Sequence, residues 1–297
     1  MCSSDLSRRP AVERLERGHS GYPGALESLE YPPRVLYAIG SLACLDGAPQ
    51  RLVAVVGTRS PTRYGLRVAR AVGQAIAEAG GVVVSGMARG IDSAAHEGAL
   101  DAGGATIAVL GTGPDVPYPA TNRRLHERVV AAGLVLSESP PGTTAFPGCF
   151  PRRNRIIAGL SVATIVVEAG FKSGALNTAG LAEAINRPVG VFPGQIDVPN
   201  AAGSNLLIRD GAILLGSIDD ALALAQLSRN ATVSRPVLGG DEADLWAALG
   251  QGEGTVEQLA AVSGLETRRA LEAVGRLELA GLVARGVDGV IGRSGVG

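Results

Sequence analysis

Residues 150–178 hold the densest set of groups in the chain that could bind an anion. A basic cluster with a neighbouring aromatic residue comes first, then an apolar segment at 162–167, then a polar turn that reads as the start of a helix. Guanidinium groups pair with phosphate oxygens, a ring beside them can stack on a base, and a helix N-terminus favours an anion. We therefore expect a site for a phosphate-bearing ligand. The groups are Phe150, Arg152, Arg153, Asn154 and Arg155 before the apolar segment, and Lys172, Ser173 and Gly174 after it.

Two turns containing glycine add groups of the same kind. Each follows an apolar run typical of a buried strand, at 52–56 and at 82–84. In parallel sheets the carboxyl ends of the strands share one edge, where α/β proteins bind their ligands. We expect both turns at that edge, although neither has the GxGxxG spacing of a dinucleotide site. The first turn consists of Gly57, Thr58 and Arg59, and the second contains Ser85, Gly86 and Arg89.

Titratable residues do not form a recognisable catalytic or metal-binding set. His96 and His126 fall on different predicted helices, and neither pairs with a serine or cysteine nucleophile in a known order. The three cysteines show no CxxC spacing. A pair of carboxylates could serve a glycosidic-bond hydrolase, but sequence spacing does not show which carboxylates are close together. We assign no catalytic residue, metal or cofactor. The carboxylates near predicted strand ends or loops are Asp92, Asp115, Glu138 and Glu168.

Apolar strands alternate with amphipathic helices, which predicts a doubly wound, mostly parallel, Rossmann-like sheet. The 42 glycines suit its tight strand-to-helix turns. We expect Asp92 to cap its helix and a short edge strand to lie at 35–38. The other expected strands are 52–56, 82–84, 106–110, 134–137, 162–167, 189–192 and 212–214. The expected helices are 64–79, 92–102, 122–132, from 174 to about 186, 205–210 and 218–227.

The chain is predicted to contain two folded domains. Residues 1–34 are expected to form an N-terminal extension, 35–227 the Rossmann-like domain and 228–240 a linker. Residues 241–297 show three short helical patterns and a possible hairpin across Asp288 and Gly289, the outline of a winged helix.

Composition narrows the function without deciding it. The net charge is −1, so binding to nucleic acid would depend on a local basic patch. No apolar run approaches the roughly 18–20 residues of a membrane span, and residues 1–18 do not resemble a signal peptide. We expect a cytoplasmic protein.

Taken together, the motifs closely resemble those of the DNA-processing protein A (DprA/Smf) family. The resemblance covers about residues 35–216, with many motifs in the same order. They include VAVVGTR at 53–59, VSGMARGIDSAAHEGAL at 84–100, TIAVLGTG at 106–113, FPRRNRIIAGLS at 150–161, VVEAGFKSGALNTA at 166–179 and GSNLLIRDGA at 203–212.

The resemblance implies a homodimeric protein that binds single-stranded DNA without base specificity. Such a protein protects incoming DNA during natural transformation, helps to load the recombinase RecA and has no established catalytic activity. All fourteen residues named in the basic cluster and the three turns match positions of the family's DNA pocket, although Thr58 stands where serine is more usual. About 20 residues precede Tyr22, so the helical domain of many relatives is expected to be missing or vestigial.

Two other functions remain open at the level of sequence. A nucleotide phosphoribohydrolase of the lysine-decarboxylase-like type would share this sheet, but such enzymes carry a PGGxGTxxE turn. Here the corresponding AGFKSGALNTAG lacks the glutamate. A transcription regulator acting through the winged helix is disfavoured by its few basic residues, among them Arg268, Arg269 and Arg276.

Overall fold

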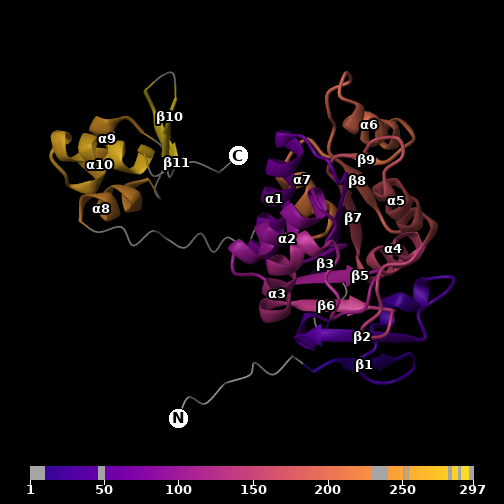
Figure 1. Cartoon of the computed structure of the whole chain (residues 1–297). Helices are drawn as coiled ribbons and strands as arrows, with labels where there is room; N and C mark the ends of the chain where they lie inside the picture. The colour runs from indigo at the N-terminus through magenta and orange to yellow at the C-terminus, as the bar shows by residue number, and fades with distance from the viewer. Residues whose placement is uncertain are drawn as a thin grey trace, which may run out of the picture. The chain divides into compact units, whose positions relative to one another are not determined.

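The chain divides into two units, and the larger unit is built around a nine-stranded sheet (Figure 1). The computed structural model describes residues 11–45, 51–228, 240–249, 252, 254–279, 283–286 and 289–293. The division between the units falls after residue 230. The expected linker at 228–240 lies outside the described residues except at its two ends.

Strands and helices alternate through the first unit, as the sequence predicts. The strands are β1 (Glu13–Glu16), β2 (Val35–Gly40), β3 (Leu52–Val56), β4 (Val82–Ser85), β5 (Thr106–Leu110), β6 (Leu134–Ser137), β7 (Ala163–Val166), β8 (Val189–Val191) and β9 (Ile213–Leu214). The α-helices are α1 (Arg63–Glu78), α2 (Ile91–Asp101), α3 (Arg123–Ala132), α4 (Cys149–Leu160), α5 (Gly174–Ala184), α6 (Ala202–Arg209) and α7 (Ile218–Leu224). Short 3-10 turns are η1 (Gly24–Ser28), η2 (Leu42–Cys44), η4 (Ala120–Asn122) and η5 (Pro199–Ala201).

The strand order creates a switch point next to β3. The order is β1-β2-β6-β5-β4-β3-β7-β8-β9, and all neighbours from β6 to β9 are parallel. The chain therefore winds from β3 toward β6 in one direction, and α4 then carries it back to β7 on the other side of β3. Ligands of open α/β sheets bind where the winding direction reverses, at the carboxyl ends of the strands.

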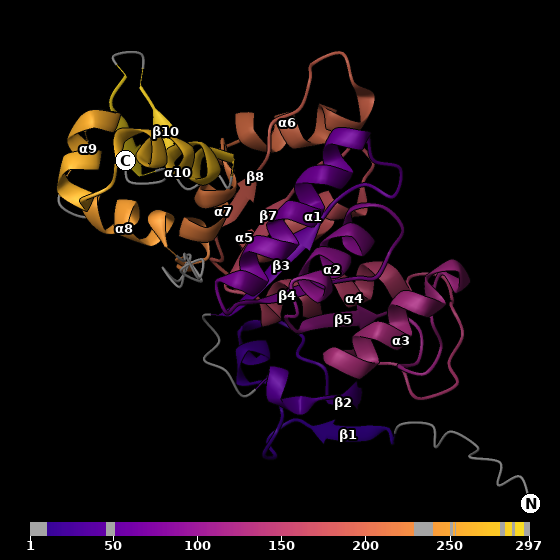
Figure 2. The same ribbon diagram turned by 90° about the vertical axis from the view of Figure 1, so that its left-hand side faces the viewer.

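Helices cover both faces of the sheet, which explains why its central strands are apolar throughout. One buried cluster joins the sheet to α1, α2 and α7, and another joins it to α4 and α5 (Figures 1 and 2). All five residues of β3 and of β5 are buried, as expected for strands of a parallel sheet covered on both sides. Helix α1 begins where the Thr62 hydroxyl accepts a hydrogen bond from the Gly65 N–H.

The N-terminal segment contributes more to the sheet than its sequence indicates. Strand β2 is not at the edge, because β1 pairs with it antiparallel on the side opposite β6. Leu15 pairs with Leu36 in that register, and Leu15, Leu26 and Leu29 are buried in the main core. The expectation of an edge strand at 35–38 is therefore wrong. Strand β1 is only four residues long and carries a single apolar side chain, too little for its periodicity to be recognised.

Asp92 does not cap α2. The residue at the N-cap is Gly90, and the Asp92 carboxylate accepts hydrogen bonds from the Gly86 and Ala88 N–H groups of the preceding loop. The physical reason is that this loop turns back over the helix start, so its own N–H groups reach the carboxylate.

The second unit consists of α8 (Asp241–Ala248), α9 (Val256–Ser263), α10 (Thr267–Leu279), β10 (Val283–Arg285) and β11 (Ile291–Arg293). The two strands pair antiparallel, as the predicted hairpin requires, although Asp288 lies outside the described residues. A separate apolar core joins the three helices to both strands. The capping box of Thr255 and Gln258 is present at the start of α9. This unit has the winged-helix architecture predicted from the sequence.

Within the described ranges, no helix is both long and apolar enough to cross a bilayer.

Candidate nucleic-acid interface

The main pocket lies at the switch point of the sheet, between the loops that follow β3 and β7. Its volume is about 500 Å³, and the first turns of α4 and α5 complete its wall. This is where the sequence places the ligand. Nine of the predicted site residues line it: Gly57, Thr58, Arg59, Phe150, Arg153, Asn154, Lys172, Ser173 and Gly174.

Hydrogen bonds to the end of β7 hold the loop after β3. The Thr58 N–H donates to the Glu168 carbonyl at 2.6 Å. The buried Glu168 carboxylate accepts from the Thr62 N–H at 3.1 Å and from the Thr62 hydroxyl at 2.9 Å. On the outer side, the Asn200 side-chain amide donates to the Ser60 carbonyl at 2.6 Å. These bonds fix the loop that presents Arg59 to the pocket.

Two glycines allow this loop to pack against the start of α2. A Cβ on Gly57 would lie 2.5 Å from Ile91 Cγ1, which is shorter than any normal van der Waals contact. Gly90 has φ +87°, and a Cβ there would clash with the Thr58 carbonyl. The close approach of the two loops therefore requires glycine at both positions.

Arg153 is buried beneath the pocket. Its Nη1 donates to the Gly86 carbonyl at 2.8 Å and also to the Val109 carbonyl. A Cβ on Gly86 would lie 2.6 Å from the Arg153 Cζ, so the guanidinium packs directly on the glycine backbone. Burial lowers the pKa of Arg153 to about 10, which still leaves it charged at neutral pH.

Asp92 places a carboxyl group beside this guanidinium at the floor of the pocket. Burial raises its pKa, while the charge of Arg153 and the hydrogen bonds from Ala88 and Gly86 act in the opposite direction. Arg153 and Asp92 thus act together as a buried framework for the loop after β4. The positive charge available to a ligand comes instead from the exposed Arg59 and Lys172.

Stacked side chains stand at the mouth of the pocket. The Arg59 guanidinium lies over the Phe150 ring, 5.4 Å from its centroid. The Tyr118 ring is inclined at 32° to the Phe150 ring, with 4.9 Å between centroids. The half-buried Phe150 ring therefore contacts both a cation and a second aromatic ring. This combination is suited to stacking a nucleic-acid base.

The N-terminus of α5 forms the opposite wall. The Ser173 hydroxyl caps this helix by accepting from the Ala175 N–H at 3.2 Å. The Asn154 side-chain amide donates to the Asn177 side-chain oxygen at 3.2 Å and ties α4 to α5. The positive end of the helix dipole and the exposed Lys172 both favour an anion at this wall.

A smaller pocket of about 220 Å³ adjoins the main one. It shares Arg59, Ala88, Phe150 and Arg153 with the main pocket, so the two are continuous around the Arg59–Phe150 pair. Gly86 and Arg89 line it, which places two more of the predicted residues at the same surface.

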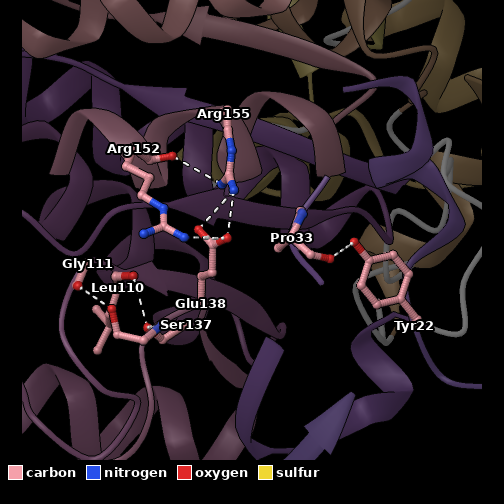
Figure 3. Close-up of polar contacts among 9 residues, drawn as sticks. Tyr22, Pro33, Leu110, Gly111, Ser137, Glu138, Arg152 and Arg155 are labelled. Carbon is pink, nitrogen blue, oxygen red and sulfur yellow. Dashed lines mark hydrogen bonds and ion pairs between the residues drawn. The ribbon is translucent and has the colours of Figure 1, made fainter. Parts of the chain in front are cut away.

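Three predicted residues do not line either of these pockets. Ser85 is fully buried, and its hydroxyl donates to the Val55 carbonyl at 2.6 Å. Arg152 and Arg155 line a different pocket and both pair with Glu138 (Figure 3). Helical periodicity explains the separation, because Phe150, Arg153 and Asn154 share one face of α4 that Arg152 and Arg155 do not.

Several residues that lie at these pockets were not predicted as site residues from the sequence. Tyr118 and Asn200 come from long loops, so their positions at the pockets depend on the path of the folded chain. Asp92 was placed near a strand end, but its position beneath the pocket depends on the fold of the loop after β4. Of the four carboxylates weighed for a hydrolase, Asp92 alone lines the main pocket, so they do not form a catalytic pair there. No group of three or more potential metal ligands occurs within the described ranges.

Comparison with known proteins identifies the family. The family model described as DNA recombination-mediator protein A matches residues 14–226, and a model of the DprA winged helix domain matches residues 229–289. The chain belongs to the DNA recombination-mediator protein A family. This confirms the family resemblance seen in the sequence. A relative named putative DNA processing protein DprA, from Mycobacterium tuberculosis, is 41% identical over 260 residues. The match covers 85% of this chain and 67% of that protein.

Two solved structures of proteins named DNA processing protein A share the fold. DNA processing protein A from Streptococcus pneumoniae is 42% identical with a TM-score of 0.67, over 71% of this chain and 73% of that one. DNA processing protein A from Helicobacter pylori is 32% identical with a TM-score of 0.65, over 73% of this chain and 97% of that one. The Helicobacter structure is described as showing a single-stranded DNA binding mode.

Proposed function

We propose that the chain is a single-stranded DNA-binding protein that processes DNA in natural transformation and recombination. The observation that carries this proposal is the Arg59–Phe150 pair at the mouth of a pocket built from glycine loops and a helix N-terminus. Relatives named as DNA processing proteins, and the single-stranded DNA binding described for the Helicobacter protein, support it.

The strand would be held mainly through its phosphates. Arg59, Arg89 and Lys172 are exposed at the two adjoining pockets and can pair with phosphate oxygens. The Phe150 ring would accept one base by stacking, an interaction worth about 1–3 kcal/mol. Because phosphates and ring faces are common to all four nucleotides, we expect binding without base preference.

The broader biological role follows from family membership as a proposal. We expect the protein to act as a homodimer in the cytoplasm, to protect incoming single strands and to help load the recombinase RecA. No catalytic step is proposed.

The test is a fluorescence anisotropy titration with labelled oligo-dT, with mixed-sequence oligomers and with duplex DNA at several salt concentrations. The logarithm of the association constant should fall linearly with the logarithm of salt, with about 0.7 of slope for each phosphate contact. The affinities of all single strands should be similar. A salt-independent affinity would contradict the proposal, and a strong preference for one base would contradict the phosphate-based mode.

A further inference from the structure

A second pocket lies on the other side of α4 from the main one. Its volume is about 550 Å³, and its lining combines aromatic, proline and arginine side chains. None of its lining residues lines the main pocket. They are Tyr31, Pro32, Arg34, Val35, Tyr37, Glu138, Pro140, Arg152 and Arg155.

Glu138 organises the two arginines of this pocket (Figure 3). The Arg155 Nη2 donates to both Glu138 carboxylate oxygens, at 2.8 and 2.9 Å, and its Nη1 donates to the Arg152 carbonyl at 3.2 Å. The side chains of Arg155 and Glu138 are mostly buried, with 16% and 17% of their surfaces exposed. Arg155 is therefore a framework residue, held by the chain itself.

Arg152 remains able to bind a ligand. Its Nη2 pairs with Glu138 at 2.9 Å, but 59% of the side chain is exposed. Arg34 is also exposed and has no ion pair within the described part of the chain. With three guanidinium groups and one carboxylate, the lining residues carry a net charge of +2. The pocket therefore favours an anionic ligand.

The turn that carries Tyr31 and Arg34 is fixed from behind. The Tyr22 hydroxyl donates to the Pro33 carbonyl at 2.7 Å, as Figure 3 shows. Burial raises the pKa of Tyr22 to about 12, so this hydroxyl stays protonated and keeps donating at neutral pH. The exposed Tyr31 ring therefore lies on an ordered turn. A hydrogen bond with the Glu30 side chain raises the pKa of the Tyr31 hydroxyl.

The two pockets are adjacent along α4. Pro151 lines the main pocket and the next residue, Arg152, lines the second. The two pockets therefore meet at the first turn of α4, and a strand that continues past Pro151 would approach Arg152. Exposed rings combined with cations along a backbone track are the usual features of sequence-tolerant single-strand binding.

We infer that this second pocket is a subsite for a further nucleotide of the strand held in the main pocket. A phosphate binds between Arg34 and Arg152, and a base stacks on Tyr31. The inference rests on the proposed function, since it assumes that single-stranded DNA occupies the main pocket.

The test is a length series of labelled oligo-dT from about 4 to about 16 nucleotides, the range of site sizes known for single OB folds. The double variant Tyr31→Ala/Arg34→Ala should match the wild type on the shortest oligomers that bind. On the longest it should bind about tenfold more weakly, with a salt slope lower by about 0.7. Arg70→Ala, which removes an exposed arginine paired with Glu97 on the α1–α2 surface, is the control and should match the wild type at every length.

A gain-of-affinity variant provides an independent readout. Glu138→Gln removes the negative charge that faces Arg152, so long oligomers should bind several-fold more tightly, with the salt slope steeper by up to about 0.7. Short oligomers should be unaffected. Unchanged or weaker binding of the long oligomers by this variant would count against the subsite.

The outcomes separate the subsite from the main function. If the double variant equals the wild type at every length while Arg59→Ala binds weakly, the subsite is refuted and the function stands. Equal weakening at all lengths would also refute it, because the residues would then act on the main pocket. If the wild type binds no oligomer, the subsite and the proposed function fail together.

Discussion

The Arg59 guanidinium lies over the ring of Phe150, although 91 positions separate the two residues in the chain. One residue belongs to the loop after β3 and the other to the first turn of α4. Both residues line the pocket at the switch point of the sheet. A cation and a ring in contact offer a strand both a phosphate partner and a stacking surface.

Replacing Arg59 should weaken binding to every single-stranded sequence by a similar factor. Arg59→Ala removes one charged phosphate contact, worth about 1.5–3 kcal/mol, which corresponds to about 10- to 150-fold in affinity. The salt slope should fall by about 0.7. Titrations with oligo-dT and a mixed sequence measure both quantities. Arg59→Lys retains the charge and should recover most of the slope, whereas a loss confined to one sequence would argue for base readout.

Replacing Phe150 should give a different signature. Phe150→Leu removes a stacking surface worth about 1–3 kcal/mol, so affinity should fall by about 5- to 150-fold. The ring carries no charge, and the salt slope should therefore stay at the wild-type value. Phe150→Tyr keeps the ring and should bind like the wild type. A changed slope in the leucine variant would show that the ring acts by positioning Arg59 rather than by stacking.

Gly86 should be essential for stability. In Gly86→Ala the new methyl group would force the Arg153 guanidinium away from the Gly86 and Val109 carbonyls, leaving buried polar groups without partners. We expect a loss of about 2–3 kcal/mol in the free energy of unfolding, measured with urea. Gly180→Ala is the matched control. It lies inside α5 with open space around its Cβ, and alanine there should stabilise by about 0.5–1 kcal/mol. Equal effects of the two substitutions would contradict the packing of Arg153 on Gly86.

His96 should make the fold sensitive to acid. Thr106 donates its hydroxyl proton to the Val83 carbonyl at 2.8 Å, so it accepts from the His96 Nδ1, and Nε2 carries no proton. Burial lowers the pKa of His96 from 6.5 to about 3. The unfolded chain therefore binds more protons between these values, and stability falls as pH drops through this window.

The expected slope is about 1.4 kcal/mol per pH unit within that window. His96→Gln should flatten this part of the curve, which urea unfolding at pH 7 and pH 5 would measure. The same substitution at the exposed His19 is the control. If His96→Gln leaves the acid dependence of the unfolding free energy unchanged, the assigned neutral state of His96 is wrong.

Much of the fold could be predicted because its signals are local. The apolar run of β3, the stripe of α1 and the capping box of α9 each depend on residues close together in the chain. Strand β1 could not be predicted, because its four residues are recognisable only through their pairing with β2. The role of Asp92 likewise depends on the path of a loop and not on its own position at the start of a helix.

The candidate site was predictable in its location and less so in its details. Glycine turns and cations at strand ends indicate one edge of a parallel sheet, and the structure brings most of them together there. Residues 152–155, which the sequence presents as one basic cluster, divide between two pockets in the structure. Spacings of three and four along α4 place Arg153 beneath the main pocket and Arg152 with Arg155 on Glu138. Burial also turns Arg153 from a ligand group into a framework residue.

The most direct test of the central claim is a crystal structure of the chain with a short oligo-dT. The account predicts one base stacked on the Phe150 ring, with phosphates beside Arg59 and at the N-terminus of α5. A strand bound to the second unit alone, or on a surface away from residues 57–59 and 172–175, would contradict it.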